Sequence, residues 1–299
     1  MLADDAGRGP LRQSVLRAIQ TVGHRLDYGT SVYEREWDLL IVLDGCRPDA
    51  LATVAPSFAF VGEVDRVRSV GSCSSEWLTR TFDPERVDAV AGTAMVTGNT
   101  WTDRYLDADA FAALDEVWKY AWDGGLGTVP AGAITDRAVA LARDRDPERL
   151  VVHYMQPHHP FVPDPVAGDE GMARTGARSS DANPWVALRR GEVSVERVRR
   201  AYEANLRYVL ESVAVLLDNV STDRAVITAD HANLFGEWGL YGHPMHTPVP
   251  ALVTVPWVET DGRDRGTYEP TLSPPEPLPV GRVYGDGDAT DRLAALGYR

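Results

Sequence analysis

The chain has 299 residues, and 44% of them are hydrophobic, which is enough to bury the core of a large globular domain. Its 44 acidic residues outnumber its 30 basic residues, giving a formal net charge of −14 at pH 7. That charge argues against nucleic acid as the main partner, because binding to a phosphate backbone depends on a basic surface. Lys119 is the only lysine, and this composition indicates either a salt-adapted cytoplasm, which we favour, or an acidic protein from a GC-rich genome.

No apolar run reaches the roughly 18 residues of a membrane-spanning helix, so no membrane span is expected. The first residues lack the apolar stretch and the cleavage site of a signal peptide. The two cysteines, Cys46 and Cys73, are too few for a disulfide framework, which favours a cytoplasmic location. Cys46 lies two residues after Asp44 and could approach Cys73 in space, so a redox-sensitive pair stays open.

Residues 11–26 place apolar side chains at helical spacing, which predicts an amphipathic helix ahead of the main domain. In residues 38–43, Asp38 is followed by an unbroken apolar run that stops at Asp44. Such a run is typical of a strand buried on both faces of a parallel sheet. Further strands are predicted at 87–96, 150–155, 224–230 and 250–255, and helices at 74–82, 107–121, 133–145 and 194–219.

Strands that alternate with helices predict an α/β fold with a mainly parallel central sheet sandwiched by helices. We divide the chain into an N-terminal helix and lead-in (1–35), an α/β catalytic domain (36–258), and a flexible acidic tail with a short terminal helix (259–299). Residues 162–186 are rich in Pro, Gly, Asp and Ser and are interpreted as a surface excursion. In such sheets, ligands bind where the strands reach their carboxyl ends.

Six of the seven histidines fall in two segments, 153–159 and 231–246, and both segments follow or end predicted strands. Asp44 ends another predicted strand, so all three groups should meet at one edge of the sheet. Asp44 with the Asp230-His231 pair indicates a cation site, because carboxylate and imidazole ligands suit hard-to-borderline divalent ions. Taken singly, each of these residues also fits an ordinary turn or helix cap.

A candidate nucleophile lies in the segment VRSVGSCSSEWLTRTF. Cys73 and Ser74 are small polar residues at the start of a predicted helix, where free N–H groups and the helix dipole favour an anion. The alternative is a plain serine cap with Glu76 as its capping-box partner.

Together these segments resemble the sulfatase/alkaline-phosphatase superfamily across roughly residues 36–258, and the composition suggests a member of haloarchaeal type. The matching motifs are LIVLDGCRPDAL, HHPF and TADHANLFGEWGLYGHP. The resemblance implies an alkaline-phosphatase-like fold, with Asp44, Asp230 and His231 as metal ligands. It also implies that His158 contacts the substrate and that His243 stands where the family has a cation beside the ester oxygen.

The nucleophile segment departs from the sulfatase pattern. Sulfatases carry a Cys that is converted to formylglycine and is followed by Pro or Ala and then Arg, whereas this chain has Cys73-Ser-Ser-Glu-Trp. Relatives use an unmodified Thr, Ser or Cys at this turn for phospho-group transfer. Cys73 matches best by position, and Ser74 is the alternative. Ala232 and Asn233 also replace the usual Gly and Glu after the Asp-His pair.

The expected function is therefore hydrolysis of a sulfate or phosphate ester through a covalent intermediate on Cys73 or Ser74. One divalent cation, either Ca, Mn, Zn or Mg, would be held by the Asp-Asp-His set. His158 and His243 would neutralise charge on the transferring group, and one of them could protonate the leaving oxygen. The guanidinium of Arg47 would donate two hydrogen bonds to the anion, unless it forms only a surface salt bridge.

The expected substrate is a small anionic ester, which could be linked to a sugar. Two other readings stay open. In the first, a transferase moves a phospho group onto a glycan or lipid, with residues 162–186 and the N-terminal helix holding the acceptor. In the second, a degenerate member of the superfamily binds anionic sugars without turnover.

Overall fold

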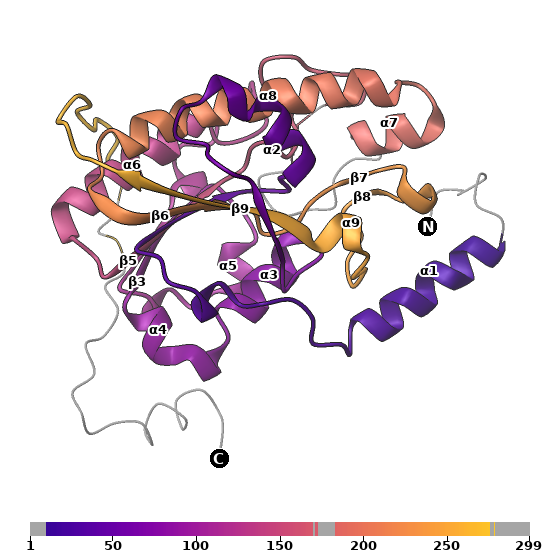
Figure 1. Ribbon diagram of the computed structural model, residues 1–299, viewed down its shortest axis with the longest axis horizontal. Coiled ribbons are helices and arrows are strands. Elements are labelled where there is room, and N and C mark those ends of the chain that lie inside the picture. The colour runs from indigo at the N-terminus through magenta and orange to yellow at the C-terminus, as the bar shows by residue number, and fades with distance from the viewer. Residues whose placement is uncertain (1–9, 170, 173–182, 276–277, 279–299) are drawn as a thin grey trace.

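The computed structural model of the protein describes residues 10–169, 171–172, 183–275 and 278. Within this part of the chain, seven strands form one sheet in the order β2-β9-β6-β1-β5-β3-β4 (Figure 1). The strands of this sheet are β1 (Leu39–Leu43), β2 (Asp65–Arg68), β3 (Thr93–Thr97), β4 (Ala113–Glu116), β5 (Arg149–Tyr154), β6 (Thr222–Thr228) and β9 (Thr254–Gly262). A separate two-stranded ribbon consists of β7 (Leu234–Phe235) and β8 (Tyr241–Gly242).

The sheet is mixed but mostly parallel. β1 lies between β5 and β6 and is parallel to both, and β3 is parallel to β4 and β5. β9 runs antiparallel to β6 and β2. The described helices are α1 (Pro10–Gly23), α2 (Pro48–Val54), α3 (Ser74–Thr81), α4 (Val87–Ala91), α5 (Thr102–Tyr105), α6 (Ala131–Arg145), α7 (Pro184–Arg190), α8 (Val195–Leu217) and α9 (Pro250–Val253).

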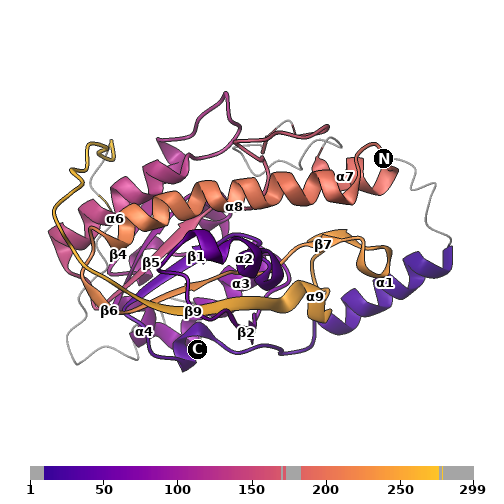
Figure 2. The same ribbon diagram turned by 45° about the horizontal axis from the view of Figure 1, so that its top comes forward.

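Two hydrophobic cores lie on the two faces of the sheet, and β1 contributes to both. Ile41 belongs to the core that is shared with α2, α6 and α8, whereas Val42 belongs to the core that is shared with α3 and α4. This alternation follows from the two-residue period of a strand, and it explains why the whole of β1 is apolar. Figures 1 and 2 show the corresponding layers, with α6 and α8 on one side of the sheet and α3 and α4 on the other. The predicted α/β fold is confirmed.

Four of the predicted helices correspond to helices of the structure. The helices predicted at 74–82, 133–145 and 194–219 correspond to α3, α6 and α8, and the amphipathic N-terminal helix corresponds to α1. Each of these segments keeps its apolar residues on one stripe for two turns or more, and a strand cannot bury such a stripe.

The prediction of one helix at 107–121 is wrong. Residues Ala113–Glu116 form the edge strand β4, with short 3-10 turns before and after it. The backbone of Ala113 pairs with Ala94 of β3, and the buried Asp115 carboxylate accepts a hydrogen bond from Arg137 Nε at 2.8 Å. These tertiary contacts outweigh the modest helix propensity of an alanine-rich segment.

Two predicted strands began too early in the sequence. The segment at 87–96 starts with helix α4, and β3 follows only after Gly92. The segment at 250–255 starts with the short helix α9, and β9 follows at Thr254. Pro250 occupies the first position of α9, where the missing N–H of proline costs no hydrogen bond, so the helix is locally consistent.

The structure describes residues 259–275 and residue 278 of the segment after residue 258. β9 runs through residue 258 and ends at Gly262. The Asp136 carboxylate on α6 accepts backbone hydrogen bonds from Thr271 and Leu272, both at 2.9 Å. The terminal helix predicted at 289–299 lies outside the described residues. Among the helices that the structure describes, none combines the length and the apolarity required to cross a bilayer.

Replacing Ile41 by Ala should lower the free energy of unfolding by about 2–5 kcal/mol, because its fully buried side chain would leave a cavity in the core. Urea denaturation would measure this loss. Val22→Ala is the matched control, since Val22 is 55% exposed and its truncation should change stability by no more than about 0.5 kcal/mol. Equal effects of the two substitutions would contradict the assignment of β1 to the centre of the core.

Candidate active site

The topology of the sheet brings the predicted metal ligands together. Asp44 is the first residue after β1, and Asp230 lies two residues beyond the end of β6. Because β1 and β6 are parallel neighbours, their carboxyl ends reach the same edge of the sheet. Gly45 makes the turn after Asp44 with a φ of +68°, and a Cβ there would lie 2.4 Å from Asn233 Nδ2. Only glycine fits this turn without strain.

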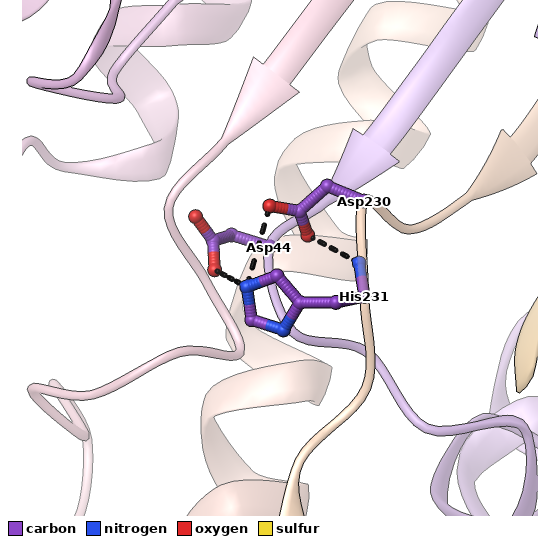
Figure 3. Close-up of side chains that lie close together, drawn as sticks. All are labelled: Asp44, Asp230 and His231. Atoms are coloured by element: carbon purple, nitrogen blue, oxygen red, sulfur yellow. Dashed lines mark hydrogen bonds and ion pairs between the residues drawn. The ribbon is translucent and has the colours of Figure 1, made fainter. Parts of the chain in front are cut away.

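Asp44, Asp230 and His231 form one compact, buried group (Figure 3). One ligand atom of each residue lies within 4.8 Å of the others. His231 Nε2 is 3.6 Å from Asp44 Oδ1 and 3.4 Å from Asp230 Oδ2. The three side chains are turned toward a common point, although Asp44 lies more than 180 positions before Asp230 and His231 in the sequence.

Hydrogen bonds at the outer side of each ligand fix which atom faces inward. His231 Nδ1 lies 2.7 Å from the Ala232 carbonyl oxygen, so Nδ1 carries the proton and the lone pair of Nε2 faces the carboxylates. Asp230 Oδ1 accepts backbone N–H groups from Gly45 at 3.0 Å and from His231 at 2.9 Å. Its Oδ2 and Asp44 Oδ1 have no hydrogen-bond partner among the described residues.

This arrangement fits a bound cation. Lone pairs of two carboxylates and one imidazole converge in a buried space, and they repel one another unless a positive charge lies between them. Two ligands of a tetrahedral zinc ion lie about 3.3 Å apart, given metal–ligand distances of roughly 2.0–2.1 Å. The separations from His231 Nε2, 3.4 and 3.6 Å, are close to that spacing. The donor set therefore suits a borderline divalent ion, and it is a candidate metal centre.

The two carboxylates differ in their electrostatics. Burial, together with the charge of Asp230, raises the pKa of Asp44 well above its usual range. Burial acts in the same direction on Asp230, but His231 and His153 outweigh it and hold the pKa of Asp230 below its usual value. In the absence of a cation, Asp44 is thus the ligand that retains a proton more readily.

Of the two candidate nucleophiles, Ser74 lies beside the metal ligands. It is the first residue of α3, and its hydroxyl oxygen is 3.2 Å from Asp44 Oδ2 and 3.4 Å from His231 Nε2. Cys73 is the cap residue before the helix, and its Sγ lies 3.2 Å from Ser75 Oγ. Burial raises the pKa of the Cys73 thiol to about 11, although the bond with Ser75 partly offsets this. A thiol with that pKa is a poor source of thiolate at neutral pH.

His158 and His243 meet next to the candidate metal centre. His158 Nδ1 lies 2.6 Å from the His159 carbonyl oxygen and therefore donates its proton there. His158 Nε2 is then an acceptor, and it lies 2.9 Å from His243 Nε2, which is the donor. The His243 ring also packs against the His231 ring, with their centroids 4.7 Å apart and their planes at 32° to each other. The structure thus brings both predicted substrate-binding histidines to the metal ligands.

The two imidazoles are neutral near pH 7. Desolvation lowers the pKa of His243 to about 3, with further contributions from His231 and His159. Burial lowers the pKa of His158 well below its usual value, and the neighbouring imidazoles of His159 and His243 lower it further. The two imidazoles therefore carry no net positive charge, and His243 can donate its Nε2–H to an anion only when the anion replaces His158 as the acceptor.

The guanidinium of Arg47 joins two loops beside the site. Its Nε and Nη2 bind the Asp49 carboxylate at 2.8 and 2.9 Å. Its Nη1 binds the Asn233 carbonyl oxygen at 2.8 Å and Glu237 Oε1 at 2.7 Å. These bonds tie the start of α2 to the loop that follows Asp230 and His231.

Two further residues at the site were given no role from the sequence. Asn99 is 1% exposed, and its Nδ2 donates to Asp44 Oδ2 at 2.9 Å, which orients the carboxylate. His153 is fully buried, with Nε2 at 3.8 Å from Asp44 Oδ2 and at 3.9 Å from Asp230 Oδ2. Asn99 follows β3 by two residues, as Asp230 follows β6, so a correct end for β3 would have indicated it.

No family model and no curated protein sequence matches the chain. Solved structures match it in fold. The integral membrane lipooligosaccharide phosphoethanolamine transferase A of Neisseria meningitidis has a TM-score of 0.54 and 12% identity, covering 85% of this chain and 55% of that one. The soluble domain of the same transferase has a TM-score of 0.51 and 14% identity, covering 77% of each chain. A putative sulfatase from Bacteroides thetaiotaomicron has a TM-score of 0.48 and 13% identity, covering 83% of this chain and 68% of that one.

These comparisons define the class of fold. The chain has the mixed α/β architecture of alkaline-phosphatase-like structures, and it shares this fold with the phosphoethanolamine transferase. It spans only 55% of the length of the first of these proteins, the membrane-integral transferase. At identities of 12–14%, the likeness shows the shared fold and leaves the reaction to be argued from the site.

Binding of Zn²⁺ should weaken as the pH falls, because the ion must displace the proton that Asp44 retains. At pH values below the raised pKa of Asp44, protonation of this group alone should lower the affinity for Zn²⁺ by about tenfold per pH unit. At pH values above that pKa, Asp44 should no longer make the affinity depend on pH. Competition with a chelating dye between about pH 5 and about pH 8 would measure it. Asp44→Asn should bind more weakly, with a slope that is smaller by one proton. Identical slopes for the two proteins would contradict the assignment of Asp44 as a ligand.

Proposed function

We propose that this protein is a metal-dependent phosphoric ester hydrolase that transfers a phospho group first to Ser74 and then to water. The observation that carries this proposal is the position of the Ser74 hydroxyl, 3.2 Å from Asp44 Oδ2 and 3.4 Å from His231 Nε2. A serine at the first turn of a helix, beside an Asp-Asp-His set, combines a nucleophile with a cation site.

Under this proposal, each residue of the site has a separate role in the reaction. Ser74 Oγ–H donates to Asp44 Oδ2, so this carboxylate can accept the proton as Oγ attacks phosphorus. The new Oγ–P bond forms while the bond from phosphorus to the leaving oxygen breaks. The leaving oxygen takes its proton from solvent water, because His243 is neutral and keeps its single N–H proton. Water then attacks the phosphoserine, and Ser74 recovers its proton. A divalent cation bound at the site would neutralise charge on the phospho group and lower the pKa of the Ser74 hydroxyl.

The side chain that lies beside the candidate metal ligands is Ser74, and a serine there favours phosphate esters over sulfate esters as substrates. The resemblance to sulfatases associates sulfate ester chemistry with a modified cysteine, and the Cys73 thiol lies against Ser75. An unmodified hydroxyl, which Ser74 provides, is associated with phospho-group transfer in the same superfamily. Because the protein carries a net charge of −14, an anionic ester also requires a local positive charge, and a cation at the Asp-Asp-His set would supply it.

Replacing Ser74 by Ala should lower kcat for an aryl phosphate by about a thousandfold or more, because it removes the hydroxyl that forms the covalent intermediate under this proposal. Cys73→Ala is the matched control and should keep kcat within about threefold of the original protein. Turnover of aryl phosphate and aryl sulfate by Zn²⁺- and Mn²⁺-loaded protein would measure both variants. The reverse pattern would make Cys73 the nucleophile. Metal and anion binding without turnover in the original protein would instead support a non-enzymatic anion-binding role.

A second candidate function is transfer of the phospho group to a hydroxyl of a glycan or lipid. The two matching structures with TM-scores of 0.54 and 0.51 are both described as phosphoethanolamine transferases, which motivates this candidate. The same phosphoserine would form, and an acceptor alcohol would replace water in the second step.

Adding a simple alcohol acceptor distinguishes the two functions. For a hydrolase, inorganic phosphate and the released phenol should stay equal in amount at any concentration of glycerol. For a transferase, glycerol should raise phenol release by about twofold or more while the yield of inorganic phosphate falls, because the intermediate partitions between the two nucleophiles. Measuring both products in one reaction gives the partition ratio, and a ratio that does not change with glycerol would exclude transfer to this acceptor.

A further inference from the structure

A buried carboxylate next to the candidate nucleophile takes no part in the chemistry proposed above. Glu76 lies in the first turn of α3, and its side chain is 4% exposed. Its Oε2 accepts hydrogen bonds from Ser72 N at 2.8 Å, from Ser72 Oγ at 2.6 Å and from Tyr28 OH at 3.1 Å. Its Oε1 accepts from the backbone N–H of His246 at 3.1 Å and is also paired with the His246 ring.

These bonds do not form an ordinary helix cap. In a capping box, Glu76 would accept the backbone N–H of the cap residue Cys73. It instead accepts the N–H of Ser72, one residue earlier, and reaches two segments that are distant in the sequence. The carboxylate therefore joins parts of the chain beyond its own helix.

Ser72 extends the same connection. Its hydroxyl oxygen accepts the backbone N–H of Thr247 at 3.1 Å and lies 3.1 Å from the carbonyl oxygen of Pro244. Glu76 and Ser72 thus hold residues 244–247, the segment immediately after His243. Ser72 also lies two residues before Ser74, so one cluster connects the turn of the nucleophile with the loop of the substrate-binding histidine.

The N-terminal helix packs on the same loop. Gln20 Nε2 donates to the Met245 carbonyl oxygen at 3.2 Å, and a Cβ at Gly23 would lie 2.2 Å from the carbonyl oxygen of His246. His246 itself adopts a φ of +55°, which is uncommon for a residue other than glycine. Figures 1 and 2 both show α1 beside α9 and the β7–β8 ribbon, the region to which this loop belongs. The loop is therefore held in a strained form from both sides.

Glu76 is suited to this task because it is ionised. Burial alone would raise its pKa, but the two hydrogen bonds from Ser72 and the proximity of His246 lower it below the usual value. An ionised carboxylate accepts hydrogen bonds at both oxygens, and all the neighbours named here can donate.

We propose that Glu76 is a positioning residue that fixes the loop carrying His243 against the turn carrying Ser74, and so sets the affinity of the site for the phospho group. The inference rests on the proposed function for the identity of the bound group. The contacts that hold the loop are independent of it.

Glu76→Gln tests the inference with little change in volume. The amide keeps one accepting oxygen but presents a donor at the other position, so it cannot accept from Ser72 and from His246 at the same time. Hydrogen exchange of residues 241–249 should become at least about tenfold faster, because the loop opens more easily. The dissociation constant of orthovanadate, an anion with the shape of the transferring group, should rise at least about tenfold. The affinity for Zn²⁺ should change by less than about twofold, since no ligand is altered.

Two further variants give the comparison its controls. Glu85→Gln makes the same chemical change at an exposed position and should leave loop exchange and vanadate binding unchanged. Ser72→Ala removes the hydroxyl that accepts from Thr247 N and donates to Glu76 Oε2, but it keeps the carboxylate itself. It should speed exchange of the same loop. If Glu76→Gln does not fold, Ser72→Ala carries the test.

Unchanged exchange and vanadate affinity in both variants would overturn the inference. A parallel loss of Zn²⁺ affinity and thermal stability would also overturn it, because it would show a general structural role. The exchange measurement needs no substrate, so it separates this inference from the proposed function. Absence of turnover in the original protein, with the loop still loosened by Glu76→Gln, would contradict the hydrolase alone.

Discussion

The site depends on the electrostatic relation between two buried carboxylates and one imidazole. Asp44 and Asp230 are at most 1% exposed, and each directs an oxygen without a hydrogen bond toward His231 Nε2. Burying two such charges costs several kcal/mol per ion unless they are paired. The described residues provide no buried Lys or Arg within this group, so a proton or a metal ion must supply the compensating charge.

Most of the surrounding structure serves to hold this unfavourable arrangement in place. The parallel pairing of β1 with β6 sets the distance between the two aspartates. Asn99 and the Gly45 N–H each bind the outer oxygen of one carboxylate and leave the inner oxygen free. Arg47 then bridges the loops that follow the two strands. An arrangement fixed by strand pairing and backbone N–H groups binds a cation without having to order flexible side chains first.

The sequence predicted the fold and the grouping of Asp44 with Asp230 and His231 because both follow from short-range patterns. A strand buried on both faces, such as Leu39–Leu43, is apolar throughout, and a polar residue at its end is conspicuous. Prediction failed where long-range contacts decide the structure. β4 became a strand because it pairs with β3, and neither this pairing nor the antiparallel course of β9 is encoded in local periodicity. The role of Asn99 was missed because the preceding strand was placed too early in the sequence.

The choice between Cys73 and Ser74 shows how precisely a sequence motif can locate a candidate nucleophile. The two residues are neighbours, but Cys73 is the extended cap residue with φ −157° and Ser74 is the first residue in helical conformation. The change in backbone direction at a helix start sends adjacent side chains to different neighbours. One thereby meets Ser75, and the other meets Asp44 and His231. A motif can therefore locate a nucleophile to within one residue, and only the geometry of the helix start separates the two.

The electrostatics of the site also set an order of events under the proposed function. The protein carries a net charge of −14, and the low pKa values of His158 and His243 leave both rings neutral. Without a cation, an incoming phosphate ester would meet the carboxylates of Asp44 and Asp230 and no positive group among these four side chains. Coulomb repulsion at such distances is only weakly screened in a buried site. The cation must therefore bind before the ester, and His243 can then donate its Nε2–H to the anion in place of His158.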